Sequence, residues 1–448
     1  MPITVEVAAE EEIYPVSSWD NGAGPMWCWG SSTIVRDGNQ VFASVNDAEP
    51  NVNPLCNTRW YLYQRTDGAG WNQVSESDDE YEREPCPLVR TSDGEILLST
   101  TPSVGIIGQY PDGRDTHRCK PTLLAFDIDA PSAPRTVVGP VWSKNYAFSE
   151  HSYRGMAADG LEGGLFLTQQ VADDRHYHPQ NYDQAWCYWN PNQVWSARGV
   201  LRFPMRGCYP TFSVDGSAVH AVAISDEVEP NKEWQEYKRE VTGRDWDYEF
   251  RQLFYSWTPD ITSVPFSPAL TIASQDETAG QIHHRGMYID PEGDAHVLYV
   301  ERNIWHPFMR GRFFPDTPIV TELKYAKISR GRVTGRRTLV SSTEEIPDDQ
   351  STQGVMVGPV VTGAAIHATP DGRVFVLWHQ TDQNDDETGL FIRQMLPEWD
   401  DFVAKIALNH PLPSFFSASQ SAGCLPSNTV DLLGQVGDVI RYAQIAVS

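Results

Sequence analysis

The sequence predicts an all-β fold, a seven-bladed β-propeller that residues 1–448 form as a single domain. Three observations favour it. One short unit recurs seven times, and its turn glycines are separated by 56, 66, 56, 77, 79 and 65 residues, close to 448 divided by seven. The 33 Gly and 32 Pro are scattered along the chain and form no linker. Aromatic residues make up 11%, as expected for many short strands joined by turns.

The recurring unit is an apolar approach strand, an Asp-Gly-like turn and a second apolar strand. Asp-Gly between two apolar runs is a strong hairpin signal, because Gly takes the positive φ of the turn without steric cost. The last instance is the weakest. In chain order the units are Ile34–Val45, Leu88–Leu98, Met156–Leu167, Phe212–Ile224, Met287–Val300, Ile366–Trp378 and Gln435–Tyr442.

A third strand with alternating aromatic residues follows most units. The segments are Arg59–Arg65, Thr122–Asp127, Ala185–Trp189, Gln252–Trp257, Leu323–Ile328 and Gly389–Arg393. Three or four short antiparallel strands per period are typical of propeller blades. Because the last unit lies close to the C-terminus, we expect Ile3–Val7 to join the last blade as its outer strand and to close the ring.

Composition limits the partners and the compartment. The net charge of −26 disfavours nucleic acid and anionic membrane surfaces as partners. No apolar run is long enough to span a membrane, and no export signal is visible. We therefore expect a monomer that is either cytoplasmic, or extracellular or periplasmic after removal of an export signal. The seven cysteines have no Cys-x-x-Cys spacing, so buried free thiols are expected. The chemistry requires no cofactor; a structural calcium or zinc held by distant loops is the alternative.

In a propeller, the residues just before each approach strand converge on one face near the axis, here called the mouth. On this acidic chain the mouth residues are cationic and aromatic, as a site for an anionic sugar would be. They are Trp27, Trp29, Arg83, Cys86, His151, Arg154, Arg206, Tyr209, His283, His284, Arg285, Thr362 and Cys424.

Four of the side chains expected at the mouth are candidates for proton transfer. His151 precedes an approach strand, and His176 and His178 follow the second strand of the same unit. Imidazole exchanges protons near neutral pH. Tyr209 follows Arg206, whose guanidinium would lower the pKa of the phenol and make it a base. The alternatives are a structural histidine and a buried tyrosine with a satisfied hydroxyl.

A second set is expected to bind substrate: Trp29, Arg154, His176, His284, Arg285 and Arg302. Only one of His283 and His284 can face the axis, because adjacent residues of a strand point to opposite sides. Arg302 would otherwise form a salt bridge with Glu301 or Asp294. The insert Asp226–Arg251 is either a short helix that forms one wall of the cleft or a solvated loop.

The order of these elements over Tyr146–Ser329 resembles that of a known family. It runs from a His before an Asp-Gly hairpin, through a loop His and an aromatic third strand, to Tyr-Pro and then a blade ending Leu-Lys-Tyr-Ala-Lys-Ile. This pattern is similar to that of the seven-bladed propeller polysaccharide lyases of the BNR-type repeat superfamily. They include the ulvan lyases and rhamnose-glucuronate lyases, with a related rhamnosidase-like branch.

The resemblance implies β-elimination at C4 of a uronic acid in a polysaccharide or oligosaccharide. It places His151, His178 (or His176) and Tyr209 as acid and base, with an arginine that neutralises the carboxylate. This chain departs from the family pattern at one position. The family has an arginine at the end of the strand after Tyr-Pro, and the corresponding residues here, near Ser225–Asp226, include no arginine. Arg206, Arg285 or Arg302 would take its place.

Two other functions remain open. A glycoside hydrolase acting on a rhamnose/uronate-type or sialidase-like substrate would use two carboxylates, and no pair stands out at the expected mouth. A non-catalytic carbohydrate-binding propeller is the third reading, since the fold alone implies no activity.

Overall fold

The computed structural model describes residues 3–27, 30–78, 80–136, 139–172, 182–244, 248–345, 355–382 and 387–448. Regular structure in these ranges is nearly all β-strand, with two short helices, α1 (Lys232–Thr242) and α2 (Pro307–Phe313). The predicted all-β class is therefore confirmed.

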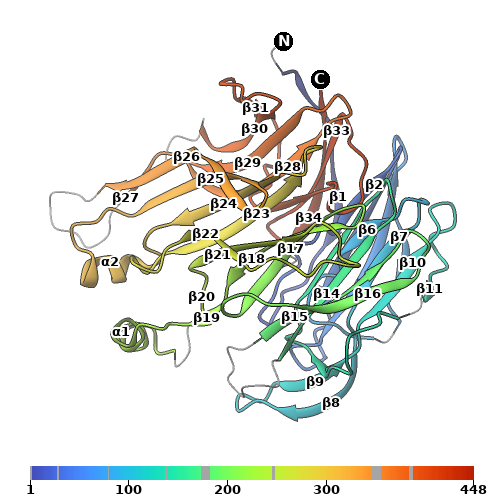
Figure 1. Ribbon diagram of the computed structural model, residues 1–448, viewed down its shortest axis with the longest axis horizontal. Helices are drawn as coiled ribbons and strands as arrows, with labels where there is room; N and C mark the ends of the chain where they lie inside the picture. The colour runs from blue at the N-terminus through green and yellow to red at the C-terminus, as the bar shows by residue number, and fades with distance from the viewer. Residues whose placement is uncertain are drawn as a thin grey trace.

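The described residues form seven antiparallel sheets of four or five strands (Figure 1). Their first strands are β2 (Ile34–Asp37), β6 (Leu88–Arg90), β13 (Arg154–Ala158), β17 (Gly207–Asp215), β23 (Gln281–Ile289), β28 (Val360–Ala368) and β32 (Phe415–Ser417). Their second strands are β3 (Gln40–Ala48), β7 (Ile96–Thr100), β14 (Leu165–Ala172), β18 (Ala218–Ser225), β24 (Ala295–Arg302), β29 (Val374–Thr381) and β33 (Thr429–Val436).

The outer half of each sheet follows in the same order. The third strands are β4 (Thr58–Thr66), β10 (Thr122–Phe126), β15 (Tyr182–Trp189), β21 (Gln252–Thr258), β25 (Val320–Ser329), β30 (Gly389–Leu396) and β34 (Val439–Val447). The fourth strands are β5 (Gly70–Glu76), β11 (Arg135–Thr136), β16 (Trp195–Leu201), β22 (Leu270–Ser274), β26 (Arg332–Glu345), β31 (Ala404–Ile406) and β1 (Val5–Pro15), and β27 (Val355–Val357) is a fifth strand beside β26.

First strands of successive sheets contact each other from β2 through β32, and β32 contacts β2. Apolar side chains fill the space between neighbouring sheets; one such cluster joins Val35 and Phe42 to Leu88 and Leu98. Residues 418–424, after β32, run to the far ends of β6 and β13. Ala422 accepts a hydrogen bond from the Arg90 backbone N–H, and Ser421 accepts one from that of Ala158.

Six of the seven predicted hairpins join the first and second strands of a sheet, as predicted. The seventh is offset, because the turn at Gly437 joins the second and third strands, β33 and β34. The first strand of the last sheet, β32, lies earlier in the chain than the repeat placed it. Cys424 consequently follows β32 and lies away from the mouth, where its Sγ accepts from the Arg36 backbone N–H.

Gly160 is needed because of a close backbone contact, which the hairpin pattern does not predict. The turn glycines Gly38, Gly94 and Gly216 have the expected positive φ, but in the third hairpin this conformation falls on Gly163. A Cβ on Gly160 would lie 1.9 Å from the carbonyl oxygen of Gly423. Gly160 therefore permits the close approach of the segment 418–424.

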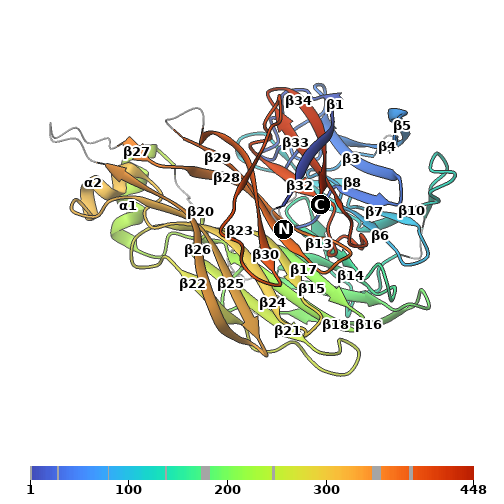
Figure 2. The ribbon, with the colours of Figure 1, turned by 90° about the horizontal axis from the view of Figure 1, so that it is seen from above.

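The N-terminal strand β1 pairs with β34 as the outermost strand of the last sheet, as predicted. Val5 lies opposite Val447, and Pro15 lies opposite Val439. The two ends of the chain lie close together in both views (Figures 1 and 2). The pairing of β1 with β34 thus completes the last sheet from the two ends of the chain.

In the described residues, two insertions outside the seven sheets contain strands of their own, and a third segment, between β24 and β25, contains α2. One is a three-stranded sheet of β8 (Ser103–Gln109), β9 (Asp115–Cys119) and β12 (Phe148–Ser149). The other follows β18 and contains β19 (Glu227–Val228), α1 and β20 (Tyr248–Glu249), so the helix expected as one alternative for Asp226–Arg251 is present. Helix α1 begins after Asn231, whose side chain accepts hydrogen bonds from the backbone N–H groups of Glu233 and Trp234.

Candidate functional site

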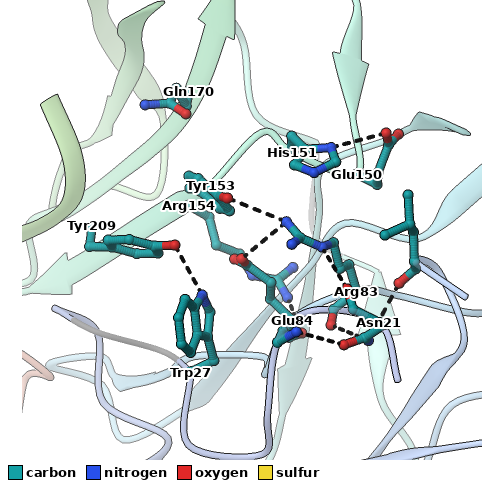
Figure 3. Close-up of polar contacts among 12 residues, drawn as sticks. Asn21, Trp27, Arg83, Glu84, Glu150, His151, Tyr153, Arg154, Gln170 and Tyr209 are labelled. Carbon is teal, nitrogen blue, oxygen red and sulfur yellow. Dashed lines mark hydrogen bonds and ion pairs between the residues drawn. The ribbon is translucent and has the colours of Figure 1, made fainter. Parts of the chain in front are cut away.

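Polar side chains from several separate segments of the chain meet near the beginnings of β6, β13 and β17 (Figure 3). Glu84 precedes β6, His151 precedes β13, and Tyr209 lies near the start of β17. Ring contacts connect this region with β23: His151 contacts Tyr153, which contacts Tyr209 at 4.9 Å between ring centroids. Phe250 contacts both Tyr209 and His283. The structure therefore brings the predicted mouth residues of three sheets together.

Glu150 and His151 form a hydrogen-bonded pair. The Glu150 carboxylate is 2% exposed; it accepts from the His117 backbone N–H at 2.9 Å and from the Tyr110 hydroxyl at 3.2 Å. His151 Nδ1 lies 3.0 Å from Glu150 Oε1. Burial alone would raise the pKa of Glu150, but the hydrogen bonds from His151 and His117 hold this pKa at about 2. Glu150 is therefore ionised and orients the imidazole.

His151 is neutral near pH 7 and 31% exposed. Burial lowers its pKa; Glu150 acts in the opposite direction, and Arg83 and Arg206 lower the pKa further. With the Nδ1 proton donated to Glu150, the lone pair of the neutral ring lies on Nε2. His151 is thus equipped to accept a proton.

Glu84 is the carboxyl group at the mouth with the opposite behaviour. Burial raises its pKa to about 7, although the nearby guanidiniums of Arg83 and Arg154 lower it. Its side chain is 12% exposed, and Oε1 lies 3.8 Å from Arg83 Nη1. Arg83 is itself held by the Asn21 carbonyl and donates to the Tyr153 hydroxyl at 3.4 Å. A carboxyl group with this pKa is available as a proton donor near neutral pH.

Five charged residues line one small cavity, and they are here called the mouth cluster. They are Glu82, Arg83, Glu84, Glu150 and Arg154. Glu82 is committed to structure, because it binds Arg154 at 2.8 Å and accepts from the Thr101 backbone N–H. That leaves Glu84 and Glu150 as two carboxyl groups in one cavity with pKa values shifted in opposite directions. The sequence carries no motif that marks this pair, although Glu84 directly follows Arg83, a residue predicted to lie at the mouth.

Tyr209 is buried, and its pKa moves opposite to the direction predicted. Its hydroxyl accepts from Trp27 Nε1 at 3.1 Å, and burial raises its pKa well above the ordinary value. The expected guanidinium contact is made by Tyr153 instead, because Arg83 and Arg206 lie 5.8 and 5.6 Å from its ring centroid. Tyr209 is therefore a poor base in this structure.

Arg206 is buried and strongly held. It pairs with Asp226 at 3.2 Å and donates to Gln170 Oε1 at 3.1 Å. Its guanidinium also lies 4.6 Å from the ring centroid of Tyr182 and 5.5 Å from that of Tyr248. The position at which the resemblance expected an arginine is thus Asp226, a carboxylate that binds Arg206.

The residues predicted to bind substrate are dispersed. Arg154 is buried and paired with Glu82, and Arg302 donates to the Ile304 carbonyl and lies over Trp305. The alternative partners of Arg302, Glu301 and Asp294, bind Lys324 and Lys327 instead.

The two adjacent histidines of β23 point to different surroundings, as predicted. His283 contacts Phe250 and Trp305. His284 bonds to Thr211 Oγ1 and to the Tyr209 carbonyl, and with Arg285 it lines a separate cavity between first strands. Trp29, His176 and His178 lie outside the described residues.

The insert between β18 and β21 is anchored by four buried charges, Glu229, Lys238, Glu249 and Arg251, here called the insert cluster. Lys238 Nζ lies 3.0 Å from Glu229 Oε2 and also contacts Glu249. Arg251 Nη1 donates to Glu229 at 2.9 Å. The cluster holds β20, whose Tyr248 lies on Arg206.

Six cysteines in the described ranges are free and buried. Cys56 and Cys119 lie closest, with their sulfur atoms 3.9 Å apart. Among the described side chains, no group of three or more His, Cys, Asp or Glu residues is arranged to hold a metal ion. No helix in the described part of the chain is long and apolar enough to cross a membrane.

No protein-family model matches the chain, and no curated protein matches it. Several solved structures are similar in shape. A protein of unknown function from Dyadobacter fermentans shares 11% identity over 99% of both chains, with a TM-score of 0.47. An α-L-arabinanase of Penicillium chrysogenum complexed with arabinobiose shares 13% over 98% of both chains, with a TM-score of 0.41. An α-L-arabinofuranosidase of Fusarium graminearum with arabinobiose shares 9% over 98% of both chains, with a TM-score of 0.43. At these values the likeness assigns no activity to this chain.

Proposed function

We propose that this chain is a glycoside hydrolase that cleaves an oligosaccharide at the mouth cluster. The observation that carries the proposal is the pair Glu84 and Glu150, which line one cavity with pKa values of about 7 and about 2. Two carboxyl groups whose surroundings separate their pKa values divide into a proton donor and an ionised partner. Glycoside hydrolysis requires such a division of roles.

In the proposed reaction Glu84 gives its proton to the glycosidic oxygen as the bond to the anomeric carbon breaks. A water molecule attacks that carbon and loses a proton to His151 Nε2. The ionised Glu150 stabilises the imidazolium through Nδ1, at 3.0 Å. The proton lost by Glu84 is restored from solvent, and His151 releases the proton that it took.

Aromatic side chains that contact His151, Arg206 and Tyr209 suit a sugar ring. Trp27, Tyr182 and Tyr248 are partly buried, and Tyr110 lies beside His151. Such rings offer an apolar face with a polar edge, which is the surface that a pyranose or furanose presents in turn. This arrangement favours a carbohydrate over a peptide or a nucleotide.

We also infer that the seven sheets are the blades of a closed propeller formed by residues 1–448 as one domain. Contacts between successive first strands, and between β32 and β2, support this inference. The pairing of β1 with β34 supplies the closing strand.

Elimination on a uronate-containing glycan is the second candidate. The observation that favours it is that two guanidiniums, Arg83 and Arg206, act on the same imidazole. Against it, Arg206 is held by Asp226, and burial raises the pKa of Tyr209. We therefore rank hydrolysis first.

The test is a panel of glycans that contains arabinobiose, rhamnose-containing and uronate-containing oligosaccharides. New reducing ends without ultraviolet absorbance indicate hydrolysis, whereas absorbance from an unsaturated uronate indicates elimination. For the wild type, kcat/KM should fall as pH rises above about 7, because Glu84 loses its proton there.

Two variants of the pair and one matched control complete the test. Glu84→Gln and Glu150→Gln should each lower turnover by about 10²–10⁴-fold. Glu76→Gln, at an exposed position of β5, should leave turnover unchanged. Full turnover by Glu84→Gln, or binding of a glycan without any product, would overturn the proposal.

A further inference from the structure

Two thiols from different parts of the chain are in contact where the sheet of β8, β9 and β12 meets the loop between β3 and β4. Cys119 is the last residue of β9, and Cys56 lies in that loop. Their sulfur atoms are 3.9 Å apart. Both residues are buried, with 1% of Cys56 and 4% of Cys119 exposed. The structure thus holds two free thiols side by side on segments that are separated by 63 positions in the chain.

Other contacts hold the same two segments together. Asn53, in the loop, accepts at Oδ1 a hydrogen bond from the Asp115 backbone N–H at 3.0 Å, and its Nδ2 donates to the Gly113 carbonyl at 3.4 Å. Cys119 lies in the middle strand of its sheet and is paired with both β8 and β12. The backbone on both sides of the thiol pair is therefore fixed, and the two sulfur atoms are kept near each other.

The segment that carries Cys119 also orients Glu150 of the mouth cluster. The His117 backbone N–H, two residues before Cys119, donates to Glu150 at 2.9 Å. The Tyr110 hydroxyl, which follows β8, donates to the same carboxylate at 3.2 Å. A covalent bond from Cys119 to the loop between β3 and β4 would therefore fix the segment that supplies both donors.

We propose that Cys56 and Cys119 form a modification site at which a peroxide oxidises the two thiols to one disulfide. One thiolate attacks a peroxide oxygen, the O–O bond breaks, and a sulfenic acid forms with release of hydroxide. The second thiol attacks the sulfenic sulfur, the S–S bond forms, and the sulfenic oxygen leaves as water. The proton of the first thiol joins the hydroxide as a second water. Two sulfur atoms are oxidised and one hydrogen peroxide is reduced, so the electrons balance.

The position of the pair fits this reaction. A disulfide bond is about 2 Å long, so the sulfur atoms have to approach by about 2 Å. Cys119 lies between the exposed residues Arg118 and Lys120, so it is close to solvent along the chain. The hydrogen bond with Cys119 and burial raise the pKa of the Cys56 thiol, and the reaction is expected to be faster at alkaline pH. The inference is independent of the proposed hydrolysis, because its test measures a covalent bond and not turnover.

The experiment incubates the folded wild type with excess hydrogen peroxide at about pH 8.5, near the pKa of an ordinary thiol. The protein is then denatured in an alkylating agent that blocks the remaining thiols. Digestion without reduction should give a peptide that joins Cys56 to Cys119, and five of the seven thiols, seven less two, should be alkylated. Because the bond joins residues 63 positions apart, the Tm should rise by about 4 °C.

Alanine variants identify the two thiols. Cys56→Ala and Cys119→Ala should each lose the linked peptide and the rise in Tm. Cys187→Ala is the matched control, because Cys187 is another buried free thiol, in β15, and this variant should keep both. The proposal is wrong if all seven thiols of the wild type are alkylated, if Cys56 and Cys119 become sulfinic or sulfonic acids, or if the linked peptide joins other cysteines. The wild-type digest decides between these outcomes even if an alanine variant does not fold.

Discussion

The mouth cluster and the insert cluster contain the same kinds of groups but are balanced differently. The insert cluster has two carboxylates and two cations, all at most 1% exposed, and each carboxylate contacts a cation. Burial alone would raise the pKa of Glu229, but Arg251 and Lys238 hold it below the ordinary value. The mouth cluster has three carboxyl groups but only two guanidiniums, so one carboxyl group is in excess. The carboxyl group whose pKa rises, to about 7, is Glu84.

The difference shows how buried charge becomes either structure or chemistry. In a balanced cluster every carboxylate has a cation beside it, so the cluster acts as an anchor. A cluster with one carboxyl group in excess keeps that group close to titration, which a proton donor needs. Four substitutions sharpen this comparison.

The largest loss of stability is expected in the insert cluster. Lys238→Met leaves Glu229 and Glu249 buried with one cation, and it should lower the free energy of unfolding by about 3–5 kcal/mol. Denaturant unfolding measures this change. Lys232→Met, at an exposed position of the same helix, is the control and should change stability by less than about 0.5 kcal/mol. Equal effects of the two substitutions would show that the cluster does not anchor α1.

In the mouth cluster, Glu84→Gln should increase stability at high pH. The pKa of Glu84 is raised from 4.5 to about 7, so its contribution to stability is fully present below pH 4.5 and is lost as pH rises through 7. Glutamine carries no charge to bury. The variant should therefore exceed the wild type by on the order of 3 kcal/mol at pH 8 and match it at pH 4. A difference that does not depend on pH, measured beside Glu76→Gln, would contradict the raised pKa.

Tyr209→Phe is expected to have a smaller effect. The change removes the acceptor of the hydrogen bond from Trp27 Nε1 and should cost about 1–2 kcal/mol. Turnover should change only a few-fold under the proposed hydrolysis. A loss of about 10³-fold at unchanged fold, checked by circular dichroism, would restore the elimination reading.

The smallest effect on stability is expected for His151→Ala. The side chain is 31% exposed, and Glu150 keeps its hydrogen bonds from His117 and Tyr110. The free energy of unfolding should fall by less than about 1 kcal/mol, while turnover falls by about 10²–10⁴-fold. Stability is measured by thermal unfolding and turnover by initial rates, both on the same preparation of the variant. An active variant would remove His151 from the reaction.

Local patterns predicted much of the architecture. The hairpins at Gly38, Gly94 and Gly216 and the outer strand at the N-terminus follow from apolar alternation and turn chemistry within short windows. The repeat is weakest at Gly437, where the predicted first and second strands are the second and third strands of the sheet. The reason is that a hairpin signal does not say which strands of a sheet the turn joins. The error moved Cys424 away from the mouth.

The sequence by itself determined the strand periods, the turns and the set of chain segments that approach one another. Only the tertiary structure decided which of their side chains titrate near neutral pH. Glu84 carries no motif, and Tyr209 lies close to an arginine in the chain, yet burial raises the pKa of both. The reason is physical: strand pairing depends on neighbouring residues, whereas a pKa depends on burial and on charges that distant segments bring to the same place.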